Sequence, residues 1–211
     1  DDEGADLMQA NIDLRVNVGT GLNLKVGYFQ TVLGAETYNY NENAFYSRSF
    51  GFQVEPTHHT GVLASYQAGP LALKFGVAND TTDNGVNEEA GVNGTAFLGS
   101  VGYTLNALDR EIKLKYALVS GAGADADEED SHYVEAATTL VEGVTYKLAV
   151  DWTDKDVGAD NSVIGHYLSY AVNDSVTINA RIEMGNINSG GTAAFGDDQN
   201  IDGLESYTIG V

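Results

Sequence analysis

The sequence predicts an all-β fold, an antiparallel up-and-down β-barrel whose strands cross a membrane. Apolar and polar residues alternate with period two along most of the chain, which is typical of β-strands. Short turns and long polar loops alternate between these segments, as in transmembrane barrels. Tyr and Trp lie near the segment ends, where the two surfaces of a membrane would be.

The first expected hairpin covers residues 8–31. Residues 8–18 place apolar side chains on one face and polar ones on the other, and 22–31 resume the pattern after the Gly19-Thr20-Gly21 turn. A soluble sheet would bury the apolar face, whereas a transmembrane barrel exposes the apolar face to lipid and the polar face to water. The fold therefore depends on which face meets water.

A connection over 32–60 leads to the remaining strands. Hairpins with turns at 68–70, 106–109, 142–143 and 173–174 follow, separated by polar loops at 79–94, 121–131, 154–162 and 186–203. At 164–170 the outward face is ambiguous, because Val163 and Tyr167 compete with Ile164, Leu168 and Tyr170. The later strands are expected at 60–67, 71–78, 97–105, 112–118, 134–140, 144–152, 164–170, 176–184 and 204–211.

Aromatic residues mark both ends of these strands. The residues near short turns are Tyr66, Tyr103, Tyr146 and Tyr170, and those near long loops are Tyr28 and Trp152. Two interfacial belts would produce this pattern, although Tyr is also a good strand residue in general.

Strand parity predicts an incomplete barrel. Eleven strands are expected, and the chain stops inside the last one. Bacterial single-chain barrels have an even number of strands, because an open edge cannot sit in lipid. We therefore expect one barrel domain over 1–211 that is part of a larger barrel.

Composition excludes several classes of protein. No apolar run approaches the roughly 20 residues of a membrane helix. The absence of Cys removes disulfides and thiolate metal sites, and the formal net charge of -21 argues against nucleic-acid binding. No signal peptide is seen, since the chain opens on Asp1-Asp2-Glu3 as a mature or internal segment would.

Charged residues fall on the polar faces of the expected strands. A solvated sheet face would also carry Lys, so this pattern alone does not separate a pore wall from a soluble surface. In a barrel the pore-lining residues would be Asp13, Arg15, Lys25, Lys74, Lys113, Lys115, Glu135, Lys147, Asp151, Arg181 and Glu183.

Two segments around the first long connection resemble a known family. GLNLKVGYFQTVLGAETY and the later FYSRSFGFQVEPTHHTGVLASY are similar to β-barrel porins of the OmpL-like type from Gram-negative bacteria. The specific match covers residues 8–79, and beyond it only the rhythm of strands and loops agrees. The resemblance implies an outer-membrane pore and supplies no catalytic site.

The connection over 32–60 holds the most unusual cluster of residues. If it folds into the lumen, Arg48 would oppose Glu55 and narrow the pore, whereas an ordinary structural loop would pair Arg48 with any nearby carboxylate. His58 and His59 also belong to these constriction candidates, but they would point to opposite faces of an extended segment and could not both bind one metal.

The expected loop over 121–131 is a weak candidate for Ca²⁺, which prefers carboxylate oxygens. The order of ligands in an EF-hand is missing, so we expect a solvated acidic loop without a resident metal or cofactor. Together the acidic loops could hold divalent ions that bridge lipopolysaccharide phosphates. The acidic residues of this segment are Asp125, Asp127, Glu128, Glu129 and Asp130.

No catalytic site is expected. Asp13, Glu135, Asp151 and Glu183 could be a glycosidase pair, but they lie on different strands with Lys and Arg between them. No nucleophile elbow, phosphate loop or zinc motif occurs. A barrel-based enzyme would need paired carboxylates at a pore mouth.

The sequence thus favours an outer-membrane porin that passes small hydrophilic solutes or ions by passive diffusion. Its long acidic loops would be extracellular, with lipid and lipopolysaccharide as partners. Porins often form homotrimers, but no residue identifies a subunit interface. The alternative is a soluble secreted or surface β-sandwich for adhesion or carbohydrate binding, which would need its apolar faces to meet in a core.

Overall fold

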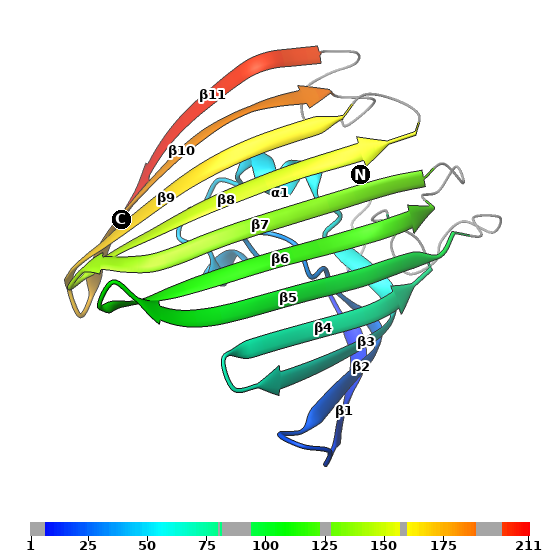
Figure 1. The fold of residues 1–211 in the computed structure, drawn as a ribbon. Helices are drawn as coiled ribbons and strands as arrows, with labels where there is room; N and C mark the ends of the chain where they lie inside the picture. The colour runs from blue at the N-terminus through cyan, green and yellow to red at the C-terminus, as the bar shows by residue number, and fades with distance from the viewer. Residues whose placement is uncertain (1–6, 80, 82–93, 123–127, 157–159, 189–199) are drawn as a thin grey trace.

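One antiparallel sheet of eleven strands forms the protein, in the order β1 to β11 (Figure 1). The computed structural model describes residues 7–79, 81, 94–122, 128–156, 160–188 and 200–211. The strands are β1 (Ala10–Val16), β2 (Leu22–Gln30), β3 (His58–Ala68), β4 (Leu71–Ala78), β5 (Ala96–Ala107), β6 (Arg110–Ala122), β7 (Glu128–Val141), β8 (Val144–Lys155), β9 (Asn161–Asn173), β10 (Val176–Asn188) and β11 (Asn200–Gly210).

Each strand pairs with its neighbours in the chain, so the predicted up-and-down topology and the eleven strands are confirmed. The turn after β5 shows why such hairpins form. Leu108 and Asp109 have φ of 55° and 56°, the left-handed values of a two-residue turn whose twist matches the flanking strands. The sheet curves strongly, and β1 and β11 are its edges, with no pairing between them among the described residues.

Several strands are longer at the long-loop end than the sequence predicts. The expected acidic loop over 121–131 is wrong in part, because β6 runs to Ala122 and β7 begins at Glu128. Likewise β10 runs to Asn188 and β11 begins at Asn200, inside the loop expected at 186–203. Backbone pairing continues where polar residues occupy both faces, so the apolar alternation stops before the strand does.

The two faces of the sheet have opposite character, and the apolar one is exposed. Along the convex face Leu14 is 52% exposed, Phe75 62% and Ile209 79%. On the concave face Tyr133, Arg181 and Glu183 are each 2% exposed or less. The ambiguity in β9 is resolved, since Ile164, Leu168 and Tyr170 face outward while Val163 is buried on the concave side; the sheet is therefore inside out relative to a soluble one.

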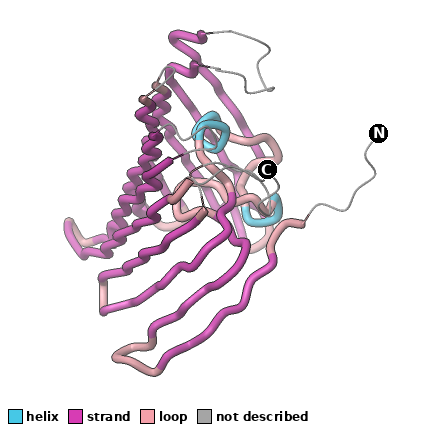
Figure 2. Tube along the Cα trace, turned by 90° about the vertical axis from the view of Figure 1, so that its right-hand side faces the viewer, coloured by secondary structure: helices cyan, strands magenta, loops and turns pink. Residues whose placement is uncertain are grey.

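The concave side is occupied by the connection between β2 and β3, residues 31–57, which we call the inner loop (Figure 2). It contains the short helices η1 (Tyr40–Glu42) and α1 (Phe50–Val54), which the sequence did not predict. All eleven described strands belong to a single sheet, so no second sheet covers an apolar face as a sandwich would require. No helix in the described ranges has the length and apolar character needed to cross a membrane.

Two adjacent residues of β5 can test which face of the sheet contacts lipid. Val101, 40% exposed, points outward, and Ser100 points to the concave face opposite Lys74. For protein folded into lipid vesicles, Val101→Glu should lower the free energy of unfolding by about 1–2 kcal/mol, because the carboxylate must enter hydrocarbon. Ser100→Glu should change it by less than ~0.5 kcal/mol, and equal effects in urea titrations would contradict the assignment of faces.

Candidate functional site

The predicted pore-lining residues share the concave face. The pairing registers, which place Lys25 opposite Asp13 and Lys115 opposite Glu135, align these side chains on one side from β1 to β10. Both signs occur on this face, but the predicted residues from β2 to β6 are all Lys, and carboxylates of the set lie on β1, β7, β8 and β10. The predicted residues that lie on this face are Asp13, Arg15, Lys25, Lys74, Lys113, Lys115, Glu135, Lys147, Asp151, Arg181 and Glu183.

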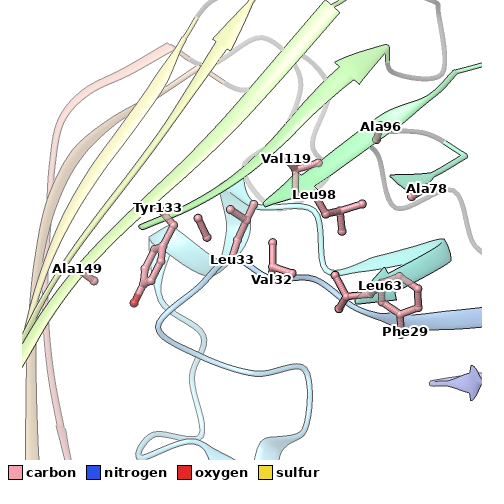
Figure 3. Close-up of a cluster of buried hydrophobic side chains, with 11 residues drawn as sticks. Phe29, Val32, Leu33, Leu63, Ala78, Ala96, Leu98, Val119, Tyr133 and Ala149 are labelled. Carbon is pink, nitrogen blue, oxygen red and sulfur yellow. The ribbon is translucent and has the colours of Figure 1, made fainter. Parts of the chain in front are cut away.

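The concave face also holds an apolar cluster that the sequence analysis missed (Figure 3). Val32 and Leu33 of the inner loop pack against wall residues from several strands. The sequence did contain a signal for this cluster, because these apolar residues occupy positions on the otherwise polar face of their strands. The wall members of the cluster are Phe29, Leu63, Ala78, Ala96, Leu98, Ala117, Val119, Tyr133 and Ala149.

Arg181 on β10 is the main polar anchor of the inner loop. Its guanidinium lies 2.6 Å from Glu36 Oε1 in the loop and 2.8 Å from Glu183 Oε2 on its own strand. It also donates to the carbonyl oxygens of Ser47 at 3.1 Å and Arg48 at 3.0 Å. Because Arg181 is only 2% exposed, these acceptors replace the water that the charge has lost.

Helix α1 starts against the same wall. The Ser49 hydroxyl accepts the Phe52 N–H at 3.1 Å as the N-cap, and Glu183 accepts the Phe50 N–H at 2.7 Å. Gly51 lies so close to β8 that a Cβ there would collide with the Asp151 carboxylate. The loop backbone thus lies close to the wall at this point, and a larger residue here would require the buried Asp151 carboxylate to move.

Arg48 contacts other residues of the inner loop rather than Glu55. Its guanidinium donates to the carbonyl oxygens of Thr37 and Tyr38, and stacks on the rings of Tyr40 at 4.1 Å and Phe52 at 4.3 Å. Within the described residues no ion pair joins Arg48 to Glu55. Arg48 therefore holds the inner loop together internally.

Glu55 faces Asp151 on β8. The two carboxyl groups are hydrogen-bonded to each other, so one proton lies between them. Burial, followed by the charge of Asp151, raises the pKa of Glu55 well above its ordinary value, and Lys115 opposes this while Glu36 adds to it. This second attachment of the loop to the wall depends on a proton.

The two constriction-candidate histidines begin β3 and point to opposite faces. His58 stacks on Tyr28 with ring centres 5.0 Å apart, and lies 4.5 Å from the Tyr38 ring in an edge contact. His59 Nε2 lies 3.0 Å from Thr31 Oγ1. Both rings are buried, so they brace the two ends of the inner loop.

Most cations of the concave wall have a carboxylate partner. Lys25 lies 2.8 Å from Asp13, Lys147 3.6 Å from Glu135, and Lys155 3.1 Å from Glu129. The four acids that could have formed a glycosidase pair are each bound to a different neighbour. Asp13 pairs with Lys25 and Glu135 with Lys147. Asp151 is hydrogen-bonded to Glu55, and Glu183 pairs with Arg181.

Only some of the candidate calcium-binding residues belong to the part of the chain that the structure describes. Glu128, Glu129 and Asp130 lie in β7, and Asp125 and Asp127 lie outside the described residues. Glu129 is paired with Lys155 across to β8. Among the residues described, no three His, Asp or Glu side chains are grouped closely enough to hold a metal ion.

Comparison with protein families gives one match. The family model described as "Putative beta-barrel porin-2, OmpL-like" matches residues 1–211, so the similarity extends well past the 8–79 region expected from the motifs. Comparisons with curated proteins and with solved structures found no match.

The Arg181 anchor gives a stability test. Arg181→Ala should lower the free energy of unfolding by about 3–5 kcal/mol, because it leaves Glu36 and Glu183 buried without their cation. Arg15→Ala is the matched control. Arg15 is exposed, and among the described residues it bonds to the Thr20 carbonyl and the Asn23 amide oxygen, so its loss should cost less than ~1 kcal/mol. Similar losses in urea titrations of both variants would contradict the anchoring role.

The shared proton predicts that the loop loosens as pH rises. The folded pKa of Glu55 is above its unfolded value, so the folded state binds the proton more tightly and its advantage is complete at low pH. That advantage falls as pH rises through the raised pKa, where Glu55 must ionise beside Asp151.

Hydrogen exchange of amides in residues 31–57, corrected for intrinsic rates, should report faster opening as pH rises above the ordinary range of a carboxyl group. Glu55→Gln keeps the hydrogen bond without the titration and should flatten this dependence. An identical slope in the wild-type protein and the variant would show that Glu55 is not responsible.

Proposed function

The chain belongs to the OmpL-like β-barrel porin family, and from this premise we propose that it forms a passive outer-membrane pore for small hydrophilic solutes and ions. One observation carries the proposal furthest: the sheet exposes its apolar face and collects its charges on the concave face. This polarity suits a wall between lipid and a water-filled lumen.

The outer membrane of a Gram-negative bacterium is the proposed location, with lipid and lipopolysaccharide against the convex face. Each of the strands β2 to β10 is hydrogen-bonded to a neighbour on both sides, which suits a hydrocarbon environment. The connections rich in Asp and Glu would then extend into the extracellular medium, where negative charge is solvated. Assembly into trimers is compatible with this arrangement.

The inner loop would narrow the pore. It fills part of the concavity and is attached to the wall by the apolar cluster, by Arg181 and by Glu55. Solutes would pass between the loop and the charged wall, and a transverse field between Lys and carboxylate side chains would favour hydrated polar molecules. Transport of this kind needs no cofactor or energy source.

We infer a channel rather than an enzyme. Catalysis by paired carboxylates needs one acid and one free base at a set separation. The wall carboxylates are instead committed to Lys25, Lys147, Arg181 and the Glu55 proton.

Planar-bilayer recording of the detergent-purified protein tests the proposal. Stepwise conductance is expected, and the reversal potential in a salt gradient reports the ion preference. Arg181→Ala should increase the unit conductance or its noise, because the loop is released. Arg15→Ala removes a cation from the same wall without releasing the loop, so it should not increase the noise. A water-soluble monomer without conductance would overturn the pore assignment.

A further inference from the structure

Two lysines on the concave wall have no ion-pair partner in the part of the chain that the structure describes. Lys25, Lys113, Lys147 and Lys155 each lie within 3.6 Å of a carboxylate oxygen. Lys74 on β4 and Lys115 on β6 do not, although Lys115 Nζ lies 4.7 Å from the centre of the Tyr133 ring. A ring face attracts an ammonium group but does not neutralise it.

Both lysines line one cavity between the wall and the inner loop. Its volume is about 230 Å³, and its other side is formed by the two ends of the loop, around Val32 and Pro56. Gln30, also in its lining, has a buried side-chain nitrogen with no acceptor among the described residues. The cavity therefore brings together two cations and an unused amide donor.

Two carboxyl groups reach the same cavity but do not cancel these charges. Glu36 is bound to Arg181 at 2.6 Å and accepts the Ser49 N–H at 3.0 Å. Glu55 is hydrogen-bonded to Asp151, and burial raises its pKa well above its ordinary value, so it opposes the lysine charges less than an ordinary carboxylate would. Lys74 and Lys115 thus repel each other across the cavity, and an anion would relieve this repulsion.

We propose that this cavity is a binding subsite for a small oxyanion, the carboxylate, phosphate or sulfate group of a solute, held by Lys74, Lys115 and the Gln30 amide. Charge-assisted hydrogen bonds from ammonium groups suit such oxygens. The volume lies below the ~300–1,000 Å³ of pockets for drug-sized ligands, which restricts the subsite to small anions. The subsite depends on the proposed pore only for the route by which the anion arrives.

Equilibrium dialysis of labelled inorganic phosphate against the detergent-purified protein, at constant ionic strength in chloride, tests the subsite. Saturable binding is expected, and Lys74→Gln or Lys115→Gln should weaken it about tenfold or more. Gln30→Leu should weaken it by a smaller factor. Sulfate and acetate should both displace phosphate, since the site recognises the oxyanion group; displacement by sulfate alone would limit it to tetrahedral anions.

Lys113→Gln is the matched control. It removes the same charge from the same strand, but Lys113 is paired with Glu111 at 3.3 Å outside this cavity, so phosphate affinity should not change. Equal weakening in all three lysine variants would indicate general attraction to a basic wall and would overturn the subsite. Unchanged secondary structure by circular dichroism ensures that each variant is folded.

Bilayer recordings of the same preparations separate the two proposals. Conductance without saturable phosphate binding would reject the subsite and leave the pore in place. Phosphate binding without conductance would reject the pore and leave the subsite. Where both hold, phosphate should reduce the chloride current of the wild-type protein and of Lys113→Gln, and reduce it much less in Lys115→Gln.

Discussion

The alternation of side chains across a β-strand is the constraint on which the whole structure depends. Because successive residues point to opposite faces, a one-residue shift in any strand would put its ionic residues on the convex face. The registers avoid this from β1 to β11, so Ile12 and Leu14 lie outside while Asp13 and Lys25 meet inside. Each hairpin turn preserves the arrangement by fixing the register of the next strand.

The inner loop is held by two physically different kinds of contact, and each compensates for a weakness of the other. The apolar contacts of Val32 and Leu33 favour burial but specify orientation poorly, because they are non-directional. Arg181 is costly to bury, yet its fixed donors match Glu36, Ser47 and Arg48 in only one placement of the loop. The apolar cluster supplies the driving force, and the guanidinium selects the position.

Sequence patterns were sufficient for the sheet and insufficient for the loop, for a reason that can be traced to particular residues. A strand repeats its signal every two residues, so the strand at 164–170 could be predicted. Competition from Tyr167 left its outward face open, and the structure shows Leu168 on that face. Helix α1 has five residues, too few for a helical period to appear. The pairing of Arg181 with Glu36 spans 145 positions, and no local pattern reports such a contact.

The ends of the strands were predicted incorrectly for a related reason. Glu129 and Asp130 are both polar, so the alternation disappears there although the backbone ladder to β8 continues. The exceptions to the alternation carried information that could have been used to predict the buried loop. Leu98, Val119 and Val163 are apolar on an otherwise polar face, and an apolar residue on such a face predicts that something packs over it.

The net charge of this protein is negative, whereas the charge around Lys74 and Lys115 on the concave wall is positive. Which of the two acts on an ion would depend on its distance from the loops and from the wall. The formal net charge is -21, and much of it lies in the connections between strands. Salt screens such charges over about 8–10 Å, so their influence is confined to the region near the loops. Beside the wall, Lys74 and Lys115 would be close to an ion in the proposed pore, and no carboxylate of the described structure lies within ion-pair distance of them. An anion repelled at the mouth would therefore be attracted once it reached the inner loop, and discrimination would come from the few residues that line the narrow part rather than from the charge of the whole chain.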